Sequence, residues 1–289
     1  MIKNKKSTNH ITNTFTYALI GLSILVVYQE IIARSNFVSV GINTVYWVEL
    51  GLPVAYLTEN KKKRYSLIGL IGIAVFVSLK STAMIAFVIP ILFVILINGY
   101  KKNGHLSKGL FVIIVLCLLI YVIIPDFEQM LQKEFGLSWI TKINNSLESG
   151  GSGRTEIWKT VISYQSDSTI GQWLFGHGYG GVITYTGRLS AHNDCFEVLF
   201  DYGLVAFIPY IYAFFCLIKS TMVMIRKKSR VGIAMGISLV QFTIISLFSH
   251  LIIYPWLLLT PSIIWAACFA ENYNSKNNSF VKANGVKCE

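Results

Sequence analysis

Ionisable and amide side chains crowd the start of a long apolar run. The stretch from Arg188 to Leu204 reads RLSAHNDCFEVLFDYGL, and apolar residues dominate its second half. His192, Asn193 and Asp194 stand together before that run, and Glu197 lies inside it. Ionisable groups at a membrane boundary are energetically unfavourable and usually mark a functional site. Histidine, with an unperturbed pKa of about 6.5, is well suited to act there as a general base.

Three cations are predicted to lie on the same side of the membrane as this stretch: Lys80, Arg154 and Arg188. The planar guanidinium of arginine suits phosphate oxygens, and the lysine ammonium acts as a point charge. The helix expected to begin near Asp194 adds its positive dipole end, which favours bound anions. Together these groups predict a site for a polyanion on a lipid carrier.

Structural roles are the alternative for the same cations. Lys80 would then only extend its ammonium to the lipid headgroups. Arg154 would be a solvated loop residue, and Arg188 would anchor the chain at the membrane interface.

The residues around His192 have a structural interpretation as well. Asp194, with Glu197 three residues later, fits a capping arrangement that satisfies free N–H groups at a helix start. Asn193 is expected either to orient His192 or to cap the same helix start. A further hypothesis has one of the two acids orient His192.

The remaining histidines, glycines and cysteines predict no nucleotide or metal site. His177, in FGHGYGG, is expected to be structural, and His250 to be a satisfied residue within a helix. The GHGYGG run matches neither of the nucleotide-binding glycine patterns. The five cysteines show no CxxC or Cys/His metal spacing. We therefore expect no metal and no disulfide framework.

The composition predicts an all-α integral membrane protein. Of the 289 residues, 54% are hydrophobic and 13% are charged, and the mean hydropathy is +0.57. Soluble domains average about 45–50% apolar and about 25% charged residues. About eight apolar segments approach the roughly 20 residues that a membrane-spanning helix requires. They run over 14–33, 38–57, 66–79, 82–98, 109–124, 195–218, 231–253 and 256–270.

The basic residues set the expected orientation. The net charge of +11 lies mainly in short runs between apolar segments, such as KKKR (61–64) and RKKSR (226–230). If every segment crosses, these runs fall on one side, which the positive-inside rule assigns to the cytoplasm together with both termini. This distribution argues against a nucleic-acid-binding face. It places residues 125–194 outside the cytoplasm, in one long loop.

The apolar pattern divides the chain into five parts. In chain order they are an N-terminal two-helix membrane segment (1–65), further membrane helices (66–124), the external loop (125–194), the C-terminal membrane helices (195–275) and a cytoplasmic tail (276–289). Within the second part the chain must turn near Lys80, because two crossings have to fit between the flanking basic runs.

The external loop is predicted to contain two helices. Residues 126–147 carry apolar side chains near helical spacing, which indicates an amphipathic helix at the membrane surface. ESGGSG (148–153) is a flexible break, RTEIWKTVISY (154–164) predicts a second short helix, and residues 171–187 are turn-rich. The buried face of the second helix is expected to consist of Ile157, Trp158, Val161 and Ile162.

Four short motifs resemble the O-antigen ligase and polysaccharide polymerase superfamily. SLKSTAMIAF is similar to an upstream motif in which Ser-Lys or Ser-Arg opens a small-residue helix. SGRTEIWK, LFGHGYGG and SAHNDCFEVLFDYGL follow the family order. That order is Ser-Gly-Arg, a Gly-x-Gly loop, and then His-Asn before a membrane helix with a Tyr-Gly pair. The resemblance covers residues 66–218.

The resemblance implies a membrane glycosyltransferase that uses no nucleotide sugar, no cofactor and no obligatory metal. Such enzymes move glycans from undecaprenyl diphosphate to an acceptor hydroxyl at the outer face of the cytoplasmic membrane. By matching positions, His192 and Arg154 would be catalytic, and Arg154 and Lys80 would bind the diphosphate. Arg188 has no firm counterpart, so a diphosphate-binding role for it follows from its position alone.

These observations predict a polymerase that joins undecaprenyl-diphosphate-linked oligosaccharide repeats into capsule, exopolysaccharide or O-antigen. Its predicted partners are that substrate, the lipid bilayer, and the flippase and chain-length regulator of the same pathway, with no nucleic acid. Two alternatives stay open. One is a ligase that passes the finished glycan to a different acceptor, and the other is a non-catalytic membrane component of polysaccharide export.

Overall fold

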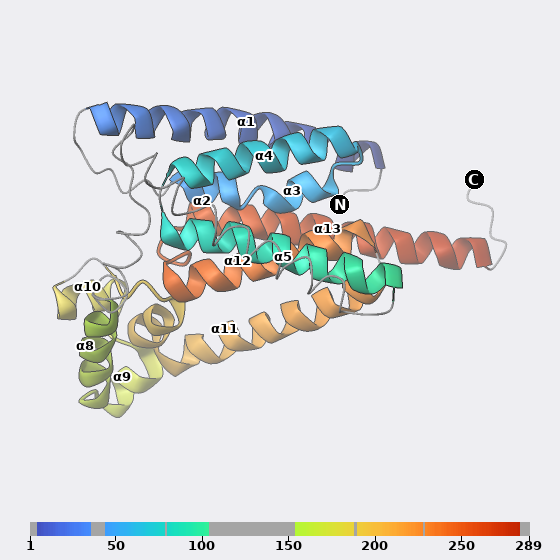
Figure 1. The fold of residues 1–289 in the computed structure, drawn as a ribbon. Coiled ribbons are helices and arrows are strands. Elements are labelled where there is room, and N and C mark those ends of the chain that lie inside the picture. The colour runs from blue at the N-terminus through green and yellow to red at the C-terminus, as the bar shows by residue number, and fades with distance from the viewer. Residues whose placement is uncertain are drawn as a thin grey trace. The chain divides into compact units, whose positions relative to one another are not determined.

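The computed structural model describes residues 5–35, 44–78, 80–103, 154–187, 190–227 and 229–283. Every regular element in these ranges is an α-helix (Figure 1). In chain order the helices are α1 (Lys5–Ser35), α2 (Thr44–Glu49), α3 (Leu52–Leu57), α4 (Lys61–Val77), α5 (Ser81–Asn103), α8 (Arg154–Ser166), α9 (Ile170–Phe175), α10 (Gly181–Thr186), α11 (Asp194–Arg226), α12 (Arg230–Phe248) and α13 (Pro255–Ala283). The all-α prediction is confirmed for this part of the chain.

Within the described ranges, three helices are long and apolar enough to cross a membrane: Ser81–Asn98 of α5, α11 and α12. α1 contains a shorter apolar stretch, Asn13–Gln29. The expected apolar segments in these ranges fall mainly on helices, whereas the total of eight spans stays a prediction. The segment 109–124, the amphipathic helix 126–147 and the break after it lie outside the described residues.

A break between two helices lies at Lys80, where the sequence predicts a turn. α4 ends at Val77, and Ser78 follows as its C-cap residue. Ser78 Oγ donates a hydrogen bond to the Val75 carbonyl (2.7 Å) and accepts one from the Lys80 backbone N–H (3.3 Å). α5 then begins at Ser81. One serine hydroxyl therefore satisfies backbone groups on both sides of the turn.

Helix packing divides the chain into two compact units. The first comprises Met1–Pro90, Phe215–Ile245 and Tyr254–Glu289, and the second comprises Ile91–Phe214 and Ser246–Ile253. In the first unit α1 packs along α4, and the short α2 and α3 also contact α4 (Figure 1). The buried core of this unit includes Leu19, Val54, Met224, Ala234, Met235 and Ile264.

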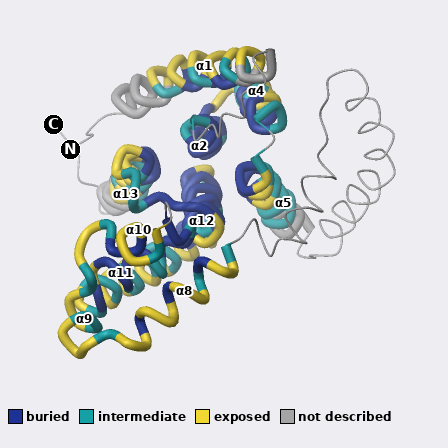
Figure 2. Tube along the Cα trace, turned by 90° about the vertical axis from the view of Figure 1, so that its left-hand side faces the viewer, coloured by how far each residue is buried: buried dark blue, intermediate teal, exposed yellow. Residues whose placement is uncertain are grey.

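The two helices α11 and α12 differ in how far they are covered by protein. In the apolar window of α12, 78% of the residues are buried, against 6% in that of α11 (Figure 2). Val205, Ile208 and Tyr212 of α11 are each more than half exposed. A long apolar helix face that is exposed in the described part of the chain is suited to contact with lipid, where the helix satisfies its own backbone groups.

Gly203 interrupts α11. Its backbone angles, φ 70° and ψ −172°, are not helical, so residues 194–202 form a short helix of their own. A Cβ atom at this position would lie 2.4 Å from the carbonyl oxygen of Leu174. Glycine is required here both by the backbone conformation and by this close approach. The break separates the polar first turns of α11 from its long apolar part.

Candidate active site

α8 packs on the segment that precedes α11. Ile157 and Val161 are buried in the core of the second unit, as predicted. The Trp158 indole N–H donates a hydrogen bond to the carbonyl of Ala191 (2.7 Å). The Trp158 ring also packs against Phe196, with ring centroids 5.7 Å apart. One aromatic residue therefore fastens α8 to the residue directly before His192.

Arg154 is the first residue of α8, four positions before Trp158. Side chains at positions i and i+4 of a helix lie on the same face, about one turn apart. Arg154 is partly buried, and it shares the face that Trp158 presents to Ala191. Arg154 thus begins the helix that Trp158 fastens to the segment containing His192.

One residue of the predicted buried face of α8 is placed differently. Ile162 was predicted to be buried, and this prediction is wrong, because its side chain is 51% exposed. The buried stripe instead follows Ile157, Val161 and Gln165, which are spaced by four residues. A stripe of that spacing leaves Ile162 at its edge.

His192 has a left-handed backbone, with φ 51°, and is the one described non-glycine residue with positive φ. This conformation costs an L-residue about 1–2 kcal/mol, and it persists where the surroundings impose it, often at functional sites. The His192 backbone N–H donates to Ser190 Oγ (3.2 Å). The Ala191 backbone N–H donates to Glu197 Oε1 (2.5 Å). Two side-chain oxygens, Ser190 Oγ and Glu197 Oε1, thus accept hydrogen bonds from the backbone N–H groups of His192 and Ala191.

Asn193, rather than Asp194, caps the start of α11. Its Oδ1 accepts hydrogen bonds from the backbone N–H groups of Cys195 (2.9 Å) and Phe196 (3.2 Å), and its Nδ2 donates to the Leu247 carbonyl (3.1 Å). The residue directly before the first turn is the one whose side chain can reach these N–H groups. Two of the helix-start donors expected to attract an anion are therefore already bonded to Asn193.

Asp194 holds the turn that follows α12. Its side chain is fully buried. It accepts hydrogen bonds from Ser246 Oγ (2.6 Å) and from the backbone N–H groups of Leu251 (2.9 Å) and Ile252 (3.2 Å). A buried carboxylate needs such donors, because desolvation is otherwise strongly unfavourable. Asp194 therefore ties the start of α11 to a segment far away in the sequence.

That turn brings a second histidine to His192. The two imidazole rings have centroids 4.9 Å apart and planes inclined by 30°. His250 is 7% exposed, and its Nδ1 lies 3.2 Å from Ser190 Oγ. The same serine hydroxyl therefore contacts the His250 ring and the His192 backbone.

The sequence analysis placed His250 within a helix, which is wrong, because α12 ends at Phe248. The lengths of α11 and α12 and their short connection indicate where His250 lies. Consecutive helices joined by a short connection run antiparallel. The end of α12 must therefore return to the level at which α11 starts.

The glycine-rich loop between α9 and α10 is fastened to α11 by two side chains. The His177 ring stacks on Phe200, with ring centroids 4.0 Å apart. Asp201 accepts hydrogen bonds from the backbone N–H groups of Gly180 and Val182, both at 2.9 Å. The turn-rich segment 171–187 thus contains two short helices, and His177 has the structural role predicted for it.

Lys80 belongs to the first unit. Its Nζ lies 4.2 Å from the centre of the Tyr46 ring, and its charge acts on the Glu49 carboxylate. Glu49 is fully buried, and neither of its carboxylate oxygens has a hydrogen-bond partner. The Glu49 backbone carbonyl accepts a hydrogen bond from Gln241 Nε2 (2.8 Å). Lys80 thus lies over an aromatic ring and near a fully buried acidic residue.

The predicted site residues are distributed over both units. Arg154, His192, Asn193, Asp194 and Glu197 belong to the second unit and Lys80 to the first, while Arg188 lies outside the described residues. In the described ranges no three His, Cys, Asp or Glu side chains are grouped so that they could hold a metal ion. The second unit therefore carries His192 and Arg154 on segments packed against each other.

Comparison with known proteins identifies the family. No curated protein matches the chain. A family model described as O-antigen ligase matches residues 66–211, which is half of the chain. The match includes Lys80, Arg154 and His192, whereas His250 lies beyond it. Family members are glycosyltransferase-like membrane enzymes that act on polyprenyl-linked glycans. The superfamily expected from the motifs is confirmed, and the chain belongs to the O-antigen ligase family of polysaccharide biosynthesis.

Proposed function

We propose that the chain is a polymerase that joins undecaprenyl-diphosphate-linked oligosaccharide repeats at the outer face of the cytoplasmic membrane. The observation that carries the proposal is the hydrogen bond from Trp158 to Ala191. This bond docks α8 on the segment that contains His192. Trp158 lies about one helical turn from Arg154 on α8. A cation for the phosphates and a base for the acceptor thus come from elements in direct contact.

In the proposed reaction an acceptor hydroxyl attacks C1 of the donor glycan. A bond forms between the acceptor oxygen and C1, and the bond from C1 to the diphosphate oxygen breaks. His192 accepts the hydroxyl proton, and the bonding electrons leave with undecaprenyl diphosphate. Arg154 and Lys80 stabilise the negative charge that develops on the leaving oxygen. Arg188 is proposed to assist them through its position shortly before His192.

The polar residues next to His192 are proposed to position it and not to react. Asn193, Asp194 and Glu197 all accept hydrogen bonds from backbone N–H groups, and all three are more than nine-tenths buried. A glycosidase-type mechanism needs two carboxyl groups that flank the reacting bond. Buried carboxylates engaged with the backbone are better suited to keep the His192 segment in one conformation.

The expected membrane orientation supports this site. The basic runs predict both termini on the cytoplasmic side, so the segment before α11 would face outward. Two lipid-anchored substrates held in one plane gain the rate advantage of proximity. A polymerase of this kind would work with the flippase that delivers the repeats and with a chain-length regulator.

A ligase is the second candidate, and the description of the matching family favours it. The two activities differ in the acceptor. Purified protein supplied only with the lipid-linked repeat would build a ladder of products if it is a polymerase. A ligase would leave the repeat unchanged until a second acceptor is added.

The catalytic assignment is tested by substitution in a strain that lacks the native gene. His192→Ala and Arg154→Ala are expected to reduce long-chain polymer at least about 100-fold, the usual effect of removing a positioned acid–base or charge-stabilising group. Lys159→Ala is the matched control, because Lys159 is exposed on the same helix. Normal chain length and amount from correctly inserted His192→Ala protein would overturn the assignment.

A further inference from the structure

The short helix α9 carries large apolar side chains that are exposed in the described part of the chain. Ile170 is 81% exposed and Phe175 is 69% exposed, Leu174 is exposed as well, and no residue of α9 is buried. Tyr179, in the loop that follows, is about as exposed as Ile170. A group of exposed apolar side chains is unfavourable in water and usually marks an interaction surface. The proposed reaction uses none of these residues.

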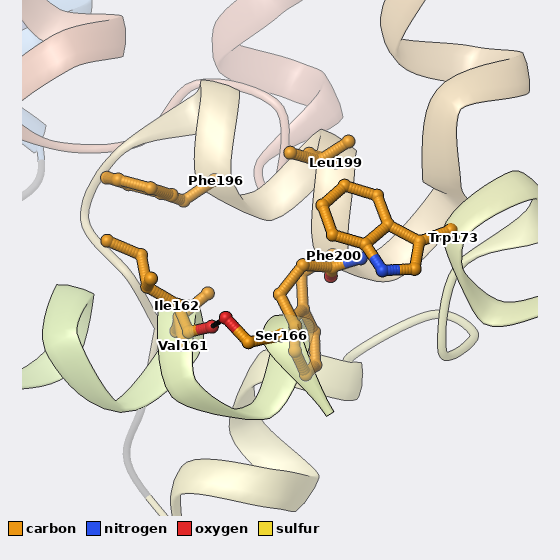
Figure 3. A pocket seen from close by; sticks show the side chains of 8 residues that line it. Val161, Ile162, Ser166, Trp173, Phe196, Leu199 and Phe200 are labelled. Carbon is orange, nitrogen blue, oxygen red and sulfur yellow. Dashed lines mark hydrogen bonds between the residues drawn. The ribbon is translucent and has the colours of Figure 1, made fainter. Parts of the chain in front are cut away.

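Trp173 and a close backbone approach hold α9 on α11. Trp173 lines a small apolar pocket, about 150 Å³ in volume, together with Leu199 and Phe200 of α11 (Figure 3). Gly176 directly follows α9, and a Cβ atom there would lie 2.2 Å from the carbonyl oxygen of Asp201. The end of α9 is therefore fixed against residues 201–203 of α11, while Ile170 and Phe175 stay exposed.

The lipid-facing part of α11 begins at these same residues. Beyond the break at Gly203, α11 continues as an apolar helix on which Val205, Ile208 and Tyr212 are each more than half exposed. Because the end of α9 touches α11 at the break, the exposed side chains of α9 lie beside the first residues of this face (Figure 1). A surface that continues a lipid-facing helix at its end lies at the boundary of the bilayer.

The local structure of α9 suits such a boundary. Thr169 and Gln172 form a capping box, in which Thr169 Oγ1 accepts from the Gln172 N–H (3.3 Å) and Gln172 Oε1 accepts from the Thr169 N–H (2.9 Å). At the other end, the Gly176 N–H donates to the Gln172 carbonyl (2.8 Å). Backbone groups bonded within the chain need fewer water molecules as partners near lipid. Tyrosine, here Tyr179, is enriched at the level of the headgroups.

We propose that α9 is an interfacial helix whose Ile170, Leu174 and Phe175 side chains insert into the headgroup region of the bilayer. The partner is the lipid surface, because the exposed patch continues the lipid-facing part of α11. A lipid-seated α9 fixes the depth of the first turns of α11, which it contacts through Trp173. This membrane contact goes beyond the proposed function and does not depend on it.

The test is photo-cross-linking of the full-length chain in membranes of the expression host that carry alkyne-tagged phospholipid. The photoreactive residue p-benzoylphenylalanine replaces Phe175 of α9, Ile208 of the lipid-facing part of α11 or, as the matched control, exposed Lys159 of α8. Lipid adducts are expected from the first two positions and at least tenfold less from the third. Absence of a lipid adduct from the Phe175 position would overturn the proposal, as would cross-linking there mainly to a second copy of the chain or to another protein.

The double variant Ile170→Asp/Phe175→Asp gives an independent measurement. Both side chains are exposed, so the variant is expected to fold. With the photoreactive residue in place of Leu174, the lipid adduct should fall tenfold or more in the variant, while the adduct from the Ile208 position stays unchanged. An undiminished adduct from the Leu174 position would refute the insertion of α9. Neither measurement requires polymer formation, so an inactive protein would contradict the proposed function and leave this result unaffected.

Discussion

The imidazole rings of His192 and His250 lie 4.9 Å apart, although the two residues belong to different segments of the chain. Ser190 joins them, because its hydroxyl accepts a hydrogen bond from the His192 backbone and lies 3.2 Å from His250 Nδ1. The base proposed for the reaction therefore lies beside a second histidine from beyond the matched family region.

This relationship predicts a positioning role for His250. His250→Ala is expected to reduce the rate of polymer formation about tenfold or more, because the Ser190 hydroxyl loses one of its two partners and the His192 ring loses its neighbour. His250→Asn is the matched variant, since the asparagine amide can occupy the place of Nδ1 and keep the contact with Ser190. It should retain most of the rate. Turnover number and donor KM are measured separately for both variants, and a change confined to KM would contradict the positioning role.

Asp194 is predicted to be essential for stability. Asp194→Ala removes the carboxyl group that accepts hydrogen bonds from Ser246, Leu251 and Ile252, and is expected to lower the free energy of unfolding by about 3 kcal/mol or more. Asp167→Ala, at an exposed acid in the same unit, should change it by less than about 0.5 kcal/mol. Thermal unfolding in nanodiscs gives the comparison. Equal stability of the two variants would show that the buried carboxylate does not hold the turn.

Gly203 and Gly176 are predicted to tolerate no side chain. A Cβ atom at Gly176 would lie 2.2 Å from the Asp201 carbonyl oxygen, and one at Gly203 would lie 2.4 Å from that of Leu174. Alanine at either position should prevent assembly of the second unit. Gly178 is the matched control, because its φ is also positive, at 92°, but no atom lies within 4 Å of a Cβ there. Gly178→Ala should cost only the backbone strain, about 1–2 kcal/mol. The yield of folded protein after extraction distinguishes the three variants, and similar yields for all of them would contradict the close approach.

Lys80 is predicted to have separable structural and functional roles. Lys80→Ala removes the ammonium that lies 4.2 Å from the centre of the Tyr46 ring, and losing a desolvated cation–π contact typically costs about 2 kcal/mol. Lys80→Arg keeps a cation over the ring and should retain most of the stability. If Lys80 binds the diphosphate, Lys80→Ala should also show a donor KM raised about tenfold or more. A native KM in Lys80→Ala would restrict Lys80 to the structural role.

Much of the architecture follows from local patterns that the sequence carries by itself. Apolar runs predict helices because a backbone in lipid must satisfy its own hydrogen bonds. The turn at Lys80 follows because two crossings have to fit in one apolar stretch. Ile157 and Val161 were found from helical spacing alone, and the ordered motifs around Arg154 and His192 were sufficient to recognise the family.

Other features depend on which segments meet, and no local pattern reports that. The choice of Asn193 over Asp194 as the cap became clear only when Asp194 was found to bind Leu251 and Ile252. His250 lies in a turn within an apolar run that is typical of helix, so only the packing places its ring beside His192. The position of α9 beside the lipid-facing part of α11 is known only from their close approach at Gly203. The sequence alone determined the helices and the chemical groups available to the site. Tertiary packing decided which of these groups share a hydrogen-bond network, because such networks join residues that lie far apart along the chain.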